Sequence, residues 1–217
     1  MIITKKKDLD SILNYLRGFE RILLLGCGAC AEQCRTGGRQ ELEEMAELLK
    51  KAGKDIVAST IVDETCYTLL LKKEFRKYTD LLKDTEAILV LSCGAGVRAT
   101  LEAIPGKPIF PALDTLFLAN VQRVGQFIEG CSLCGKCYLG ETGGICPITC
   151  CPKGLLNGPC GGVVDGMCEM NLDMPCAWVE IYKRLKSQGR LDQMKKIKPP
   201  RDYSNTIKPR KVTVRQK

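Results

Sequence analysis

Short apolar runs alternate with amphipathic stretches from the N-terminus to about residue 125. The apolar runs predict strands at 21–25, 55–62, 87–91 and 107–111. The amphipathic stretches predict helices at 8–18, 41–52, 64–82 and 114–123, with a loop and a further helix at 92–104. Because strand, loop and helix alternate at least three times, the pattern predicts an α/β domain with a parallel sheet flanked by helices.

The character of the sequence changes at about Gly130. From Cys131 to Cys176 it holds nine Cys and nine Gly and shows no clear periodicity. A segment with so few large apolar residues predicts a small module whose fold depends on bound metal. A closing helix follows at 175–188. We therefore expect an α/β cluster-binding domain at 1–129, a Cys-rich iron–sulfur module at 130–189, and a basic extended tail at 190–217.

Composition narrows the chemistry, because the chain has fourteen Cys and no His. The absence of His excludes imidazole ligands, a His general base and a Cys-His nucleophile pair. Soft metal ligands must then be thiolates, which leaves iron–sulfur clusters or all-Cys zinc. The N-terminus lacks an apolar signal-peptide core, which disfavours disulfides and favours a cytoplasmic protein. The longest apolar runs have only strand length, so we expect no membrane span.

The net charge of +8 is concentrated toward the C-terminus. Residues 190–217 contain ten Lys and Arg against two Asp, a balance that can indicate nucleic-acid binding. Tyr203 is the only aromatic residue there, so the segment lacks a platform for stacking bases. We therefore expect an arm that is solvated or lies on a partner protein, and no nucleic acid.

The first group of cysteines follows the predicted parallel strands. Because the carboxyl ends of parallel strands share one edge of a sheet, we expect its five thiols to converge there. Three are expected to bind a [4Fe–4S] cluster, with Cys93 as the fourth ligand and Cys66 as its rival. The neighbouring glycines Gly26, Gly28, Gly94 and Gly96 are expected to direct free backbone N–H groups at the cluster. The three expected ligands are Cys27, Cys30 and Cys34.

The second group begins with a C-x2-C-x2-C motif, which is typical of ferredoxins. Two later cysteines precede proline, as the remote ligand does in bacterial ferredoxins. Without Cys150, eight cysteines remain, the number that two clusters require. One expected set is Cys131, Cys134, Cys137 and Cys146, and the other is Cys151, Cys160, Cys168 and Cys176. An exchange of Cys146 with a later cysteine, and zinc at one of the two sites, are alternatives that the spacing leaves open.

The residues of this second group carry a family resemblance. The segment TGGICPITCCPKGLLNGPCGGVVDGMCEM at 142–170, with Pro175-Cys176-Ala177-Trp178 after it, resembles the C-terminal domain found with methylenetetrahydrofolate reductases. The upstream GCGACAEQCRTGG and SCGAGV motifs resemble the small iron–sulfur subunit of two-subunit reductases. Cys150 departs from the family pattern, since a residue other than Cys is expected beside Cys151.

The resemblance implies a subunit with two or three [4Fe–4S] clusters that passes electrons to the FMN of a large flavoprotein subunit. That partner would make 5-methyl-tetrahydrofolate in one-carbon metabolism, in the Wood–Ljungdahl pathway of acetogens. Ferredoxin or a larger electron-transfer complex would be the donor. The chain itself shows no acid–base motif, and solvation explains Asp63, Glu64 and Asp114 equally well, so no catalytic residue is expected. Two alternatives are a zinc-stabilised docking subunit and a cluster-bearing activator of a corrinoid methyl-transfer system.

Overall fold

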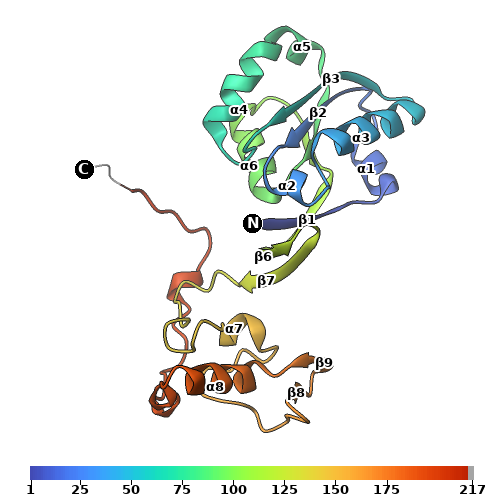
Figure 1. The fold of residues 1–217 in the computed structure, drawn as a ribbon. Helices are drawn as coiled ribbons and strands as arrows, with labels where there is room; N and C mark the ends of the chain where they lie inside the picture. The colour runs from blue at the N-terminus through green and yellow to red at the C-terminus, as the bar shows by residue number, and fades with distance from the viewer. Residues whose placement is uncertain (215–217) are drawn as a thin grey trace. The chain divides into compact units, whose positions relative to one another are not determined.

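The computed structural model describes residues 1–214, and residues 215–217 of the predicted tail lie outside the described part. The chain divides into two compact units, the first comprising Met1–Ile128 and the second beginning at Glu129. The fold of each unit is drawn in Figure 1.

The first unit is built on a four-stranded parallel sheet with strand order β3-β2-β4-β5. Its strands are β2 (Arg21–Cys27), β3 (Asp55–Val62), β4 (Ala87–Leu91) and β5 (Ile109–Pro111). In this sheet β3 lies on one side of β2 and β4 lies on the other, so the chain reverses its direction across the sheet after β3. This reversal is the kind of switch point at which parallel sheets bind ligands. The predicted parallel sheet with flanking helices is confirmed.

Helices cover both faces of this sheet, as Figure 1 shows. Alternate residues of β2 point to opposite faces: Ile22 and Leu24 pack in one core, and Leu23 and Leu25 pack in the other. The first core takes its helical residues from α1 (Leu9–Tyr15), α2 (Cys30–Gln33) and α3 (Arg39–Lys51). The second takes them from α4 (Thr68–Phe75) and α6 (Gly94–Ala103). Both faces of β2 are therefore buried, which explains its unbroken apolar run.

The helix predicted over 64–82 is interrupted in the structure. After α4, a single 3-10 turn, η1 (Arg76–Tyr78), leads into the short helix α5 (Thr79–Asp84). The Thr79 hydroxyl donates a hydrogen bond to the carbonyl of Arg76 at 2.9 Å. Such local side-chain bonds compete with the regular helical ladder, and they accompany the break here.

The helix predicted at 114–123 is wrong. Those residues form the strand β6 (Leu113–Arg123), the centre of a three-stranded sheet with order β1-β6-β7. Its edge strands are β1 (Ile2–Lys6) and β7 (Gln126–Cys131), and β1 runs antiparallel to β6. The strand β1 lies more than 100 residues away in sequence and supplies a pairing partner that local helical periodicity could not reveal.

The second unit contains little regular structure. Its elements are α7 (Pro147–Cys150), the strand pair β8 (Met167–Cys168) and β9 (Asn171–Pro175), and α8 (Ala177–Ser187). The buried core of this unit consists of Cys176, Trp178, Ile181 and Leu185, and three of these lie on α8. The amphipathic helix expected near the end of this unit is therefore present, and it carries most of the unit's core.

The segment after α8 belongs to the second unit and packs against the rest of it. It contains two 3-10 turns, η2 (Leu191–Lys195) and η3 (Ser204–Thr206). Asn157 and Lys198 exchange two hydrogen bonds of 2.9 and 2.7 Å, and the Lys198 side chain lies 3.5 Å from Glu141. The extended basic tail expected from the sequence is thus not confirmed. Within the described residues, no helix has the length and apolar character needed to cross a membrane.

Candidate metal centres

All fourteen cysteines lie in the described part of the chain and are free thiols. Across residues 1–214, no group of three or more Cys, Asp or Glu side chains is already arranged to hold a metal ion. The thiols are nevertheless distributed unevenly, because each expected set gathers at a particular place in one of the two units.

The first set lies at the carboxyl edge of the parallel sheet. Cys27 is the last residue of β2 and is only 6% exposed, and its Sγ lies 4.0 Å from the Asp63 carbonyl beyond β3. Cys66 lies in the turn after β3, and Cys93 caps the N-terminus of α6 after β4. Three consecutive strands therefore place thiols at one edge, as the topology of a parallel sheet requires.

The titration of Cys66 is affected by two other thiols at this edge. Partial burial raises the pKa of the Cys66 thiol, and the neighbouring charges of Cys93 and Cys27 raise it further. Thiols that influence one another in this way resist simultaneous ionisation until a cation is shared among them. The edge that holds Cys27, Cys66 and Cys93 is therefore a place where a bound metal group would offset thiolate repulsion.

The other two thiols of this set contact a strand that sequence reasoning missed. Cys30 begins α2 and Cys34 follows its end. The Ile2 N–H donates to Cys30 Sγ at 3.5 Å, and the Cys34 thiol donates to the Ile2 carbonyl at 3.7 Å. Because β1 is an edge strand, these main-chain groups of Ile2 are free to meet sulfur. The two isoleucines at 2–3 were the available signal for this strand.

The glycines of the first set do not act as predicted. The N–H groups of Gly28, Gly94 and Gly96 already donate to the Val62 carbonyl, the Thr115 hydroxyl and the Cys93 carbonyl. Gly26 lies within β2, where an added Cβ would come within 2.2 Å of Leu42. Glycine is required at position 26 by close packing, and the N–H groups of the other three are not free for a cluster.

In the second unit, four of the expected ligands line one pocket. These are Cys131, Cys134, Cys137 and Cys146. Two left-handed residues, Leu133 and Gly135, turn the chain between the cysteines of the motif. The Leu133 N–H donates to Cys131 Sγ at 3.3 Å, as a thiolate ligand at this position would require. We call this pocket the Cys131 pocket.

The other four line a second pocket, which we call the Cys151 pocket. Its cysteines are Cys151, Cys160, Cys168 and Cys176. Cys176 caps the N-terminus of α8 and is buried, and Trp178 on the same helix also lines the pocket. The Trp178 indole N–H donates to the Leu155 carbonyl at 3.0 Å, which fixes the ring beside the thiols.

A carboxylate also reaches the Cys151 pocket. The Glu169 carboxylate accepts a hydrogen bond from the Cys160 thiol at 3.2 Å and forms an ion pair with Lys153. The hydrogen bond from Lys153, and secondarily the one from Cys160, lowers the pKa of Glu169. Sequence reasoning missed Glu169, because its distance along the chain from Cys160 corresponds to no recognised motif.

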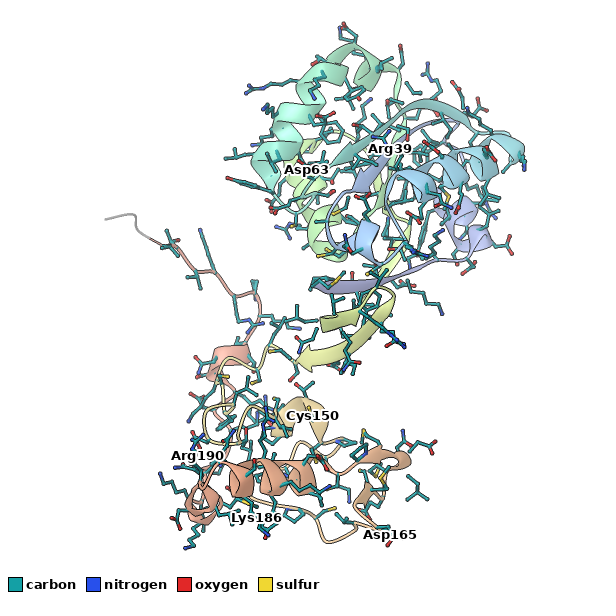
Figure 2. The ribbon with its side chains drawn as sticks, in the orientation of Figure 1. Arg39, Asp63, Cys150, Asp165, Lys186 and Arg190 are labelled. Atoms are coloured by element: carbon teal, nitrogen blue, oxygen red, sulfur yellow. The ribbon has the colours of Figure 1, made fainter. Side chains whose placement is uncertain are left out.

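Cys150 differs from the other eight cysteines of the second unit. It is the last residue of α7, where Figure 2 labels it, and its N–H donates to the Cys146 carbonyl at 2.9 Å. Burial raises the pKa of this thiol, and the charge of Cys146 raises it further. It lines neither pocket, so the structure groups the other eight cysteines in two sets of four.

The donor chemistry of both pockets fits iron–sulfur clusters. Each pocket offers four thiols, no imidazole exists anywhere in the chain, and thiolates are the usual ligands of such clusters. Four thiolates also satisfy structural zinc, so donor type alone does not separate the two metals.

Comparison with known families gives a match that includes most of the second unit. Residues 110–204 match the family described as methylene-tetrahydrofolate reductase C terminal. The expected resemblance is confirmed over this region. The match covers somewhat less than half of the chain and includes all nine cysteines from Cys131 to Cys176. Comparisons with curated proteins and with solved structures give no significant match.

Proposed function

We propose that this chain is the electron-transfer subunit of a methylenetetrahydrofolate reductase. The observation that carries the proposal is the pair of four-cysteine pockets within the region that matches the reductase family. A protein that devotes eight thiols to two pockets, without any His, is suited to hold redox clusters and unsuited to acid–base catalysis.

The thiols of the second unit would hold two [4Fe–4S] clusters, one in each pocket. The first unit would hold a third through Cys27, Cys30 and Cys34, with Cys93 or Cys66 as the fourth ligand. A bound cluster supplies a carrier for single electrons. The chain's own residues supply thiolate ligands, and the Leu133 N–H and the Ile2 N–H supply hydrogen bonds to Cys131 and Cys30. Hydrogen bonds to ligand sulfurs tune reduction potentials.

The partner follows from the family match and from the resemblance. We propose a flavoprotein large subunit that binds FMN and reduces 5,10-methylene-tetrahydrofolate to the 5-methyl form. Electrons would come from ferredoxin or from a larger electron-transfer complex. The complex would serve one-carbon metabolism in the cytoplasm, in the methyl branch of the Wood–Ljungdahl pathway where that pathway operates.

The decisive measurement is iron, acid-labile sulfide and zinc per chain in anaerobically purified protein. The proposal requires about eight to twelve irons with matching sulfide, corresponding to two or three [4Fe–4S] clusters. Little iron together with one or two zinc ions would refute electron transfer and leave a zinc-stabilised docking subunit.

The fluorescence of Trp178, the only tryptophan of the chain, should report on the Cys151 pocket alone. Because Trp178 lines the Cys151 pocket, we expect a visible-absorbing cluster there to quench its fluorescence strongly. Reconstitution of the metal-free chain with iron and sulfide should therefore quench the emission. After the same treatment, the Cys160→Ala variant should retain most of its fluorescence. The Cys134→Ala variant, which alters the other pocket, should be quenched about as much as the parent protein. Equal quenching in all three proteins would show that the Cys151 pocket holds no cluster.

A further inference from the structure

The distribution of charge differs between the two units. Fifteen of the 33 Lys and Arg residues lie from residue 129 onward, but only eight of the 25 Asp and Glu residues do. The second unit therefore carries almost all of the chain's net positive charge. A strong excess of one sign favours association with partners of the opposite sign.

Part of this charge surrounds the Cys131 pocket. Lys136 and Arg210 line the pocket itself. An adjoining hollow shares Leu133, Cys134 and Arg210 with it and is also lined by Arg201 and Lys208. We call Lys136, Arg201, Lys208 and Arg210 the basic rim. Three of its four members come from the segment after α8, which the sequence analysis treated as a separate arm.

Specific contacts hold that segment over the cysteine motif. The Arg210 guanidinium donates to the Leu133 carbonyl at 3.0 Å, between Cys131 and Cys134. Asn205 lies so close to Gly135 that an added Cβ would come within 2.7 Å of it. Gly135 also has a φ of +82°, so close approach and backbone conformation both require glycine there. The rim is therefore a built feature of the second unit.

Little negative charge opposes the rim. Asp202 is the only acidic residue between 196 and 214, and its carboxylate already accepts the Ser204 N–H at 2.8 Å. The charge of Lys136 contributes to lowering the pKa of Asp202, after the hydrogen bonds from Ser204. One carboxylate among four cations leaves the surface around the pocket positive.

The pocket inside the rim is open to solvent. Cys131 and Cys137 are exposed, whereas in the Cys151 pocket one thiol, Cys160, is exposed and another, Cys176, is buried. At the Cys151 pocket, moreover, Lys153 is compensated by Glu169. Exposed thiols within an uncompensated ring of cations distinguish the Cys131 pocket from the other.

We propose that the basic rim is the docking surface for a small acidic electron-carrier protein, which delivers electrons at the Cys131 pocket. This inference rests on the proposed function. The carrier would be oxidised by one electron, the centre held by the four thiolates would be reduced by one, and no bond or proton would be exchanged. Complementary charge around exposed redox centres speeds encounter without requiring a large interface.

Nucleic acid fits the rim less well. The only aromatic ring of the segment, Tyr203, already has the Arg201 guanidinium 4.8 Å from its centre. Single-strand binders stack successive bases on several aromatic side chains, and the rim offers no such series. Binding of an acidic protein requires only positively charged side chains, and the rim provides four of them.

The test is binding of an acidic two-cluster bacterial ferredoxin to the full-length, metal-loaded protein, measured by calorimetry at low and physiological ionic strength. The test variant is Lys136→Glu/Lys208→Glu, which reverses two rim charges and leaves the Arg210 hydrogen bond intact. The matched control is Lys186→Glu/Lys196→Glu, the same change at exposed lysines outside the rim; Figure 2 labels Lys186 on α8.

We expect the parent and the control to bind ferredoxin with similar affinity, weakening as salt is added. The rim variant should bind at least about tenfold more weakly at low salt. Equal weakening in both variants would overturn the inference, because it would reflect net charge alone. Tighter binding of a single-stranded oligonucleotide than of ferredoxin, lost in the rim variant, would overturn it as well.

Failure of the proposed function would be visible separately. Iron and sulfide content and bleaching by dithionite require no protein donor, so they report on the clusters whatever the rim binds. Protein with clusters that bleach but with no ferredoxin binding would overturn the docking surface alone. Protein without iron would overturn both.

Discussion

Individual thiols of this protein have different surroundings despite their similar spacing. Cys134 lines the Cys131 pocket, within the region that matches the family. Its thiol donates a hydrogen bond to the Lys136 carbonyl at 3.2 Å. Cys150 lies at the end of α7 and lines neither pocket, and burial raises the pKa of its thiol. We therefore expect the first to be a ligand and the second to be a partly buried side chain without a metal.

Substitution of these two residues should therefore have opposite outcomes. We expect Cys134→Ala to lose about four irons per chain and to lower the melting temperature of the second unit, because we expect its fold to depend on bound metal. Cys150→Ser, the control, should retain the iron content of the parent protein. Iron and sulfide assays with a thermal melt would check both. Iron loss in Cys150→Ser would instead make Cys150 a ligand, and Cys151 would need to be reassigned.

At the scale of elements, the carboxylate of Glu86 connects the starts of the central strands β2 and β4. Glu86, directly before β4, accepts the N–H groups of Glu20 and Arg21 at 2.6 and 3.2 Å, at the start of β2. These two backbone hydrogen bonds are the main reason that the pKa of Glu86 is lowered in the folded chain, with the Arg21 charge adding to the effect. The ionised carboxylate thus stabilises the pairing of β2 with β4.

This contact predicts a pH dependence with a definite sign. A lowered pKa means that the stabilisation is complete above the ordinary glutamate value of 4.5 and is lost as the pH falls below it through the folded-state value. We expect Glu86→Gln to lower the melting temperature of the reduced, metal-free chain by about 1–3 °C at neutral pH. The difference should shrink toward zero in acid. Circular dichroism melts between neutral and acid pH would check this, and a difference that grows in acid would contradict it.

At the scale of the whole molecule, the two units depend on different sources of stability. The first unit has a buried core on each face of its sheet, together more than twenty residues. The second has four buried residues in its core, and one of them is an expected ligand. A core of that size rarely supports a fold by itself, so metal binding should supply the remainder.

Limited proteolysis would reveal this difference. In the metal-free chain we expect trypsin to cut rapidly at Lys136 and Lys153, while a fragment that contains the first unit and ends at Arg123 or Lys136 persists. Loading with iron and sulfide should slow those cuts about tenfold or more, because cleavage requires opening of the second unit. Trypsin activity on a separate peptide substrate, measured in both samples, provides the control and should be equal in both. Unchanged rates at Lys136 and Lys153 would show that this unit holds its fold without metal.

Much of the fold could be predicted from local patterns. The central strands predicted at 21–25 and 87–91 are nearly continuous apolar runs, and burial on both faces demands such runs whatever surrounds them. The helix at 114–123 was mispredicted because Leu116 and Leu118 suit either period until β1 is known to pair beside them. The segment after α8 was expected to be extended because its composition is polar, yet Asn157, Glu141 and Leu133 hold it in place.

For the candidate centres, composition alone excluded imidazole ligands: fourteen Cys without His leave thiolates as the only soft metal ligands, whatever the fold. Spacing also divided the later cysteines into the sets that line the two pockets. Only the tertiary structure brought Ile2 to Cys30, Glu169 to Cys160 and the basic rim to the Cys131 pocket. These contacts join residues far apart in the chain or without a recognised motif, so they depend on how the backbone folds back on itself, which local sequence does not encode.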